Sequence, residues 1–154
     1  MLYLDSSVLV KRYFAEAGSD ALRERLLRGD MVYTSALSYA EVLAVMGRKF
    51  RQGVISDHEF ESLYNRMSRD WRLLWNILEL DTRTMDGVRD LVKQFGVKGA
   101  DAVHLSAALW LGNQTSLAPE FVEDEPGLEF GVSDKTLARI ASQCGLEIFD
   151  PEKG

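Results

Sequence analysis

Four acidic residues stand where a predicted strand ends or a predicted helix begins. They are Asp5, Glu41, Asp101 and Asp134. In a parallel sheet the carboxyl ends of the strands, and the helix starts that follow them, face one edge, so we expect the four side chains to lie near that edge. Mg²⁺ and Mn²⁺ are bound in proteins by carboxylate oxygens together with water and substrate phosphate. The sequence therefore indicates a candidate site for a divalent metal ion.

Each of these acids also has a purely structural interpretation. Asp5 and Asp134 are placed to act as helix N-caps, and Asp101 as an N-cap or a first-turn acid. Ser38 and Glu41 have the spacing of a capping box, in which two side chains satisfy backbone N–H groups at a helix start. Because acids are common at helix starts, both interpretations stay open at this point.

The elements that would position the acids follow from the apolar pattern. Short apolar runs predict five strands, at residues 2–4, 31–34, 77–80, 128–132 and 146–149. Helical spacing and helix-start signals occupy most of the chain between them. This alternation predicts a three-layer α/β/α fold around a mainly parallel sheet. Because the chain begins on a buried strand, we expect that strand in the middle of the sheet.

The longest amphipathic pattern lies between the second and third predicted strands. Ser56 and Glu59 predict a capping box, and apolar residues then recur at steps of three and four as far as Trp75, which predicts a core-facing helix. A single further helix is predicted from residue 81 or 82 to about residue 95. Residues 113–127 contain two prolines and a run of acids, and we expect a loop or surface excursion there.

The bulk properties are those of one globular domain. The 154 residues predict a single domain over residues 1–150 and a loose tail at 151–154. No apolar run approaches a membrane span and no signal-peptide pattern is present, so we expect a cytoplasmic protein. Cys144 permits no internal disulfide and is expected to be a small buried residue on a helix.

The net charge of −6 argues against broad affinity for nucleic acid. This argument weakens if four of the 24 acids are gathered at a metal site, because 20 then remain against 18 basic residues.

Each of the four acids lies within a longer recognisable stretch. In chain order these stretches read LDSSVLVKRYF, SALSYAEV, GADAVHLSAAL and VSDKTLARIASQCGL. They resemble the four motifs of the PIN-domain family, and most closely its VapC-like branch, the toxins of bacterial and archaeal toxin–antitoxin pairs. The resemblance covers nearly the whole chain. It implies a five-stranded parallel sheet in the order 3-2-1-4-5.

The resemblance also implies a function. The family cleaves RNA with Mg²⁺ or Mn²⁺, usually as a homodimer, and a partner antitoxin inhibits its toxin members. The protein would then be an endoribonuclease, with the four acids as catalytic residues and metal ligands. The alternative is a catalytically idle PIN fold that binds RNA or protein. One departure from the family pattern is Val132, where many relatives carry Thr or Ser two residues before the last acid; Ser133 adjoins it.

A basic cluster and one serine are further candidates for substrate binding. Arg48, Lys49 and Arg51 lie near the end of the predicted third helix, where they would contact RNA phosphates, dock an antitoxin or form a solvated face. The Ser6 hydroxyl would bond a ligand phosphate, or alternatively the start of the first helix.

A histidine shares the face of one acid. His104 follows Asp101 by three residues, so both lie on the same side of a helix. With only His58 besides, a zinc site is not predicted, and we expect His104 to be packed or solvated.

Overall fold

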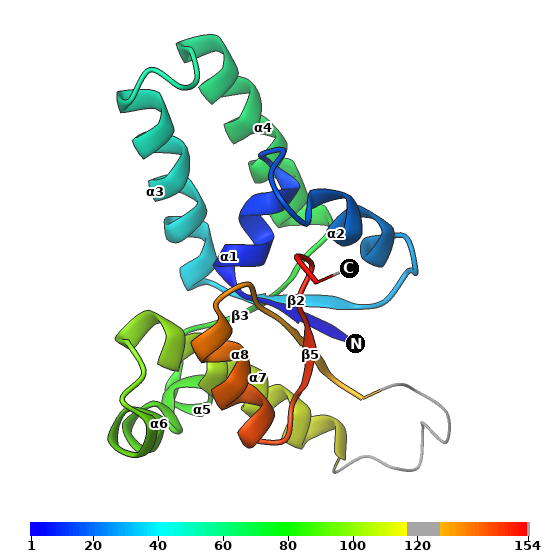
Figure 1. The fold of residues 1–154 in the computed structure, drawn as a ribbon, viewed down its shortest axis with the longest axis vertical. Coiled ribbons are helices and arrows are strands. Elements are labelled where there is room, and N and C mark those ends of the chain that lie inside the picture. The colour runs from blue at the N-terminus through cyan, green and yellow to red at the C-terminus, as the bar shows by residue number, and fades with distance from the viewer. Residues whose placement is uncertain (117–126, 154) are drawn as a thin grey trace.

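The computed structural model of the chain describes residues 1–116 and 127–153. Its centre is a five-stranded sheet in the order β3-β2-β1-β4-β5, in which every neighbouring pair is parallel (Figure 1). The strands are β1 (Leu2–Leu4), β2 (Val32–Ser35), β3 (Asn76–Leu78), β4 (Glu129–Gly131) and β5 (Glu147–Phe149). The predicted fold class, the strand order and the central place of the first strand are confirmed.

Helices cover both faces of this sheet (Figure 1). One layer contains α1 (Ser6–Leu9), the 3-10 turn η1 (Val10–Arg12), α2 (Ser19–Leu26), α3 (Leu37–Arg51) and α4 (Asp57–Leu73). The other contains α5 (Thr82–Met85), α6 (Val88–Phe95), α7 (Gly99–Ser116) and α8 (Lys135–Gln143). The chain therefore has the three-layer architecture that its sequence predicts.

The central strand divides its side chains between the two cores. Leu2 and Leu4 pack with α1–α4, whereas Tyr3 between them packs with α7 and α8. All three are fully buried. Because successive strand residues point to opposite faces, burial on both sides fixes the register of β1. Leu4 consequently lies opposite Gly131, and the two strands end side by side.

Two predicted elements in the middle of the chain differ from the structure. The single helix predicted up to residue 95 is wrong, because α5 and α6 are separate and the break falls at Gly87. A Cβ atom on Gly87 would lie 2.9 Å from Ser106 Oγ, so the break brings the chain close against α7. The third strand ends at Leu78 rather than at residue 80, and Leu80 is exposed.

The described C-terminal residues are attached to the domain, whereas a loose tail is predicted there because chain termini are commonly poorly ordered. Pro151 is buried against Gly18, where an added Cβ would meet Pro151 atoms at 2.9 Å. Glu152 accepts a hydrogen bond from Lys11 Nζ at 2.7 Å. These contacts span up to 141 positions of sequence, so no local pattern could indicate them.

Three other expectations concern the periphery. Cys144 follows α8 and is partly exposed, so the prediction of a buried helical residue is wrong. Helix α7 extends into the predicted loop at 113–127, of which residues 117–126 lie outside the described residues. Within the described ranges, no helix is both long and apolar enough to cross a lipid bilayer.

The contact between β1 and β4 predicts a sensitive position at Gly131. A Cβ atom there would lie 2.7 Å from Leu4 Cδ2 and 3.2 Å from the Tyr3 carbonyl oxygen. Gly131→Ala should therefore destabilise the protein by about 1–3 kcal/mol in urea unfolding. The matched control is Gly99→Ala, because a Cβ there meets no atom within 4 Å. Equal stability of the two variants would contradict the close packing of β4 on β1.

Candidate functional site

Asp5 is the first residue after β1 and the N-cap of α1. Its Oδ1 accepts hydrogen bonds from the Ser7 hydroxyl at 2.7 Å and from the Val8 backbone N–H at 3.0 Å. Its own N–H donates to the Gly131 carbonyl of β4 at 3.0 Å. The residue is only 4 % exposed, and burial raises its pKa to about 6 although the Ser7 hydrogen bond opposes the shift. The predicted cap is confirmed. It places the carboxylate in a buried position, where ionisation is unfavourable.

Asp134 is the third residue after β4. It is the N-cap of α8, and its Oδ1 accepts from the Leu137 N–H at 2.8 Å, which confirms the predicted cap. The Ser7 hydroxyl, which donates to Asp5, also accepts from the Ser133 N–H at 3.1 Å. Ser7 therefore links the start of α1 to the segment between β4 and α8. No local sequence pattern indicates this bridge, because it joins residues 126 positions apart.

Glu41 does not belong to the capping box predicted for it. Helix α3 begins at Leu37 without a side-chain cap, and the buried Ser38 hydroxyl shares a hydrogen bond of 2.7 Å with Thr34 Oγ1. Glu41 Oε2 instead lies 2.7 Å from His104 Nε2. Burial alone would raise the pKa of Glu41, but hydrogen bonds from His104 and Ser6 outweigh it and lower the pKa.

His104 is buried, so it is packed and not solvated. Its Nδ1 lies 3.0 Å from the Tyr3 hydroxyl, while its Nε2 contacts Glu41. The sequence placed His104 on the face of Asp101, but the contacts with Tyr3 and Glu41 were missed. Their only sequence signal is a histidine one helical turn from a candidate ligand.

Asp101 lies in the first turn of α7 and is partly buried. Burial raises its pKa, the charge of Asp134 raises it further, and the charge of Glu41 adds to the shift. Glu41 likewise adds to the raised pKa of Asp5. The four predicted acids therefore share one sheet edge, and the charges of Asp134 and Glu41 both act on Asp101.

The donor set fits a hard divalent cation in its chemistry. Carboxylate oxygens are the ligands that Mg²⁺ and Mn²⁺ prefer. Among the described residues, no lysine or arginine forms an ion pair with any of these four carboxylates, although the charge of Lys98 partly offsets the repulsion at Asp101. In their present positions, however, no three metal-binding side chains of the described residues form a closed metal-binding group. The four acids therefore lie along an open edge of the sheet and do not converge on one point.

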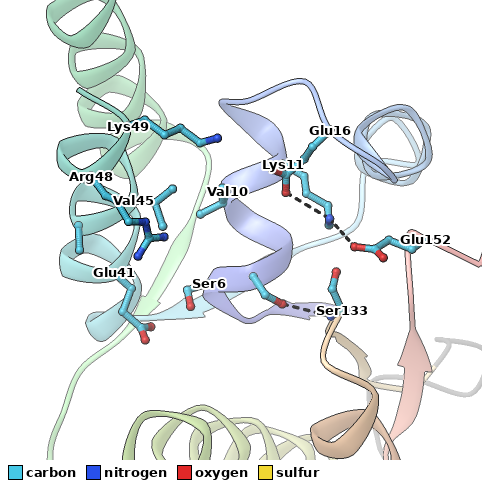
Figure 2. A pocket seen from close by; sticks show the side chains of 12 residues that line it. Ser6, Val10, Lys11, Glu16, Glu41, Val45, Arg48, Lys49, Ser133 and Glu152 are labelled. Carbon is cyan, nitrogen blue, oxygen red and sulfur yellow. Dashed lines mark hydrogen bonds and ion pairs between the residues drawn. The ribbon is translucent and has the colours of Figure 1, made fainter. Parts of the chain in front are cut away.

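A cavity of about 580 Å³ opens beside this edge (Figure 2). Its lining includes Ser6, Glu41, Arg48, Lys49 and Ser133. Figure 2 shows Arg48 and Lys49 extending from α3 on one side of the cavity, with Ser133 across from them. The structure thus brings Ser6 and two of the three predicted basic residues to one hollow next to Glu41.

Two other basic residues differ from this pair. Arg51 is exposed and does not line the cavity, so the predicted basic cluster is divided. Lys11 lines it but is already paired, since its Nζ contacts Glu16 Oε1 at 3.2 Å and Glu152 Oε1 at 2.7 Å. Arg48 and Lys49 are therefore the better candidates for an anionic ligand.

Known proteins are similar to this chain in sequence and in fold. The PIN domain family matches residues 2–113. Two relatives from Mycobacterium tuberculosis strains, Ribonuclease VapC45 and Ribonuclease VapC49, are each 30 % identical over 152 residues, which cover 96 % of this chain and 94 % of theirs. FitAcB from Neisseria gonorrhoeae aligns with a TM-score of 0.65 at 20 % identity, over 98 % of both chains. VapBC2 from Rickettsia felis, bound to a DNA fragment from its promoter, aligns with a TM-score of 0.64 at 13 % identity, over 97 % of this chain and 98 % of that one. On the sequence matches, this chain belongs to the PIN-domain family.

Proposed function

We propose that the protein is a Mg²⁺- or Mn²⁺-dependent endoribonuclease, acting in the cytoplasm as the toxin of a type II toxin–antitoxin pair. The observation that carries this proposal is the set of four carboxylates that form no ion pair with lysine or arginine among the described residues, beside a cavity that carries Arg48 and Lys49. The similarity to two VapC ribonucleases along nearly the whole chain supports RNA as the substrate.

The proposed ligands of the cation are the four acids, namely Asp5, Glu41, Asp101 and Asp134. When bound, a divalent cation would lower the pKa of a water molecule and neutralise charge that develops on the phosphate. The chain's own residues bind and orient the substrate. Arg48 and Lys49 hold neighbouring phosphates, and the Ser6 hydroxyl donates a hydrogen bond to a phosphate oxygen between them and the acids.

The proposed partners are an antitoxin and a second copy of the chain. The structural neighbours include a toxin–antitoxin complex from Klebsiella pneumoniae with a TM-score of 0.60 at 16 % identity, which supports an antitoxin partner. The homodimer rests on the resemblance to the family.

One observation favours a second candidate, an idle PIN fold that binds RNA or protein. Asp5 and Asp134 both cap helices, so each has a structural role without any metal. This candidate predicts RNA or protein binding without cleavage and no stabilisation by Mn²⁺.

The proposal predicts metal-dependent cleavage. Purified protein should cut RNA with Mg²⁺ or Mn²⁺ and stop when EDTA is added. Asp101→Asn should slow cleavage by about 100-fold or more, because a metal ligand contributes several kcal/mol to the transition state. Gel assays with end-labelled RNA measure this, and Glu61→Gln on the exposed side of α4 is the control. Cleavage by Asp101→Asn at the wild-type rate, with contaminating nucleases excluded, would rule out the assigned site.

The raised pKa of Asp5 predicts a pH-dependent cost in the metal-free protein. Between about pH 4 and pH 6 the folded protein keeps a proton that the unfolded chain has released, so its free energy of unfolding falls as the pH rises through this window. Asp5→Asn avoids the cost and retains the accepting oxygen for Ser7 and Val8. At pH 7.5 in EDTA we expect the variant to be more stable by about 2–3 kcal/mol.

Thermal melts from pH 4 to pH 8 measure this difference, which should vanish near pH 4. Glu61→Gln removes an exposed charge and should melt like the wild type at every pH. An Asp5→Asn variant that melts below the wild type throughout would show that the charge at position 5 carries no penalty.

The cavity predicts which basic residues contact RNA. Arg48→Gln and Lys49→Gln should each flatten the dependence of log K on log salt by about 0.7 for single-stranded RNA, measured by fluorescence anisotropy in EDTA. Arg51→Gln should change the slope less, because Arg51 does not line the cavity. Arg89→Gln, an exposed change on α6 in the other layer, is the control. A slope that is unchanged in all variants would leave the cluster as a solvated face.

A further inference from the structure

A buried chain of polar contacts runs from the central strand to Glu41. Tyr3 on β1 contacts His104 on α7, with 3.0 Å between the Tyr3 hydroxyl and His104 Nδ1. His104 Nε2 in turn lies 2.7 Å from Glu41 Oε2 on α3. Tyr3 is 0 % exposed and His104 is 2 % exposed. Three elements from both helical layers and the sheet are thereby joined through one imidazole.

The direction of these hydrogen bonds follows from the groups involved. Glu41 Oε2 is a carboxylate oxygen and accepts, so the proton in this 2.7 Å contact is assigned to His104 Nε2. In the neutral ring Nδ1 is then an acceptor, and Tyr3 donates to it.

The far end of this chain is rigid. The Tyr3 ring stacks on Phe130 with 5.6 Å between ring centroids and meets the His104 ring edge-on at 6.1 Å. Both aromatic residues lie in neighbouring strands, in register with each other. Packing and the Tyr3 hydroxyl therefore hold the imidazole in place independently of its contact with the Glu41 carboxylate.

The near end holds a side chain that would otherwise rotate freely. Glu41 has three side-chain torsions and lines the open cavity. Figure 2 shows its carboxylate directed away from Arg48, and no ion pair joins the two within the described residues. With Oε2 bound to His104, the carboxylate is held at the acidic edge, where Ser6 also donates to it.

Building on the proposed function, we propose that His104, oriented by Tyr3, is a positioning residue that presents Glu41 to the divalent cation. It neither binds the metal nor moves a proton in the reaction. Hydrogen-bond partners of metal ligands typically contribute 10–100-fold to metal affinity or activity. His104 should therefore matter to metal binding even when no RNA is present.

Calorimetric titration of each protein with MnCl₂ alone tests this role. His104→Leu should weaken Mn²⁺ binding by about 10–100-fold. His104→Gln should restore much of the affinity, because its amide can still donate to Glu41. Tyr3→Phe removes only the hydroxyl and should weaken binding by a smaller factor. Ile140→Val, a conservative change in the same core, is the control for lost stability and should bind Mn²⁺ as the wild type does.

A double-mutant cycle separates positioning from a structural effect. In a Glu41→Gln background, His104→Leu should cause no further loss of Mn²⁺ affinity, since its target is gone. Losses that multiply independently, or His104 variants that bind as tightly as the wild type, would overturn the proposal while leaving the metal site intact. If both His104 variants fail to fold, Tyr3→Phe with unchanged Mn²⁺ affinity would overturn it. A wild-type protein that binds no Mn²⁺ would instead refute the metal site, and the positioning role with it.

Discussion

The burial of the Asp5 carboxylate at the end of the central strand is the constraint on which the site depends. Asp5 is held by Ser7, by the first turn of α1 and by the backbone of β4. Those contacts leave it little freedom to move toward water. The sheet order places this acid at the point where the chain leaves β1 for one helical layer and β4 for the other, which is where open α/β sheets bind ligands.

The same arrangement sets stability against function. Like charges along one edge destabilise the folded chain, and Asp5 and Asp101 keep their protons more tightly because they are buried and, to a smaller extent, because of neighbouring carboxylates. Natural proteins commonly retain such strain where activity requires it. A sequence chosen for stability alone would carry amides at these positions, because Asn also caps helices.

The fold could be predicted from the sequence because its signals are local. Strand runs, the caps at Asp5 and Asp134 and the strand–helix alternation each lie within a few residues. The predictions that failed concern features that depend on long-range contacts or on fine geometry. The role of Glu41 was mistaken because the spacing from Ser38 imitates a capping box, whereas Ser38 bonds backward to β2 and Glu41 bonds across to α7. The break at Gly87 depends on contact with α7, which no local pattern reports.

The anchored C-terminal turn has a practical consequence for handling the protein. Pro151 and Glu152 fasten this end of the chain beside Lys11 at the rim of the cavity, on the carboxyl side of the sheet. Met1 precedes the central strand at the opposite, amino side. An affinity tag at the C-terminal end would extend from beside Lys11 and crowd the entrance of this cavity. The same tag placed before Met1 would project from the remote side of the sheet and leave that entrance clear.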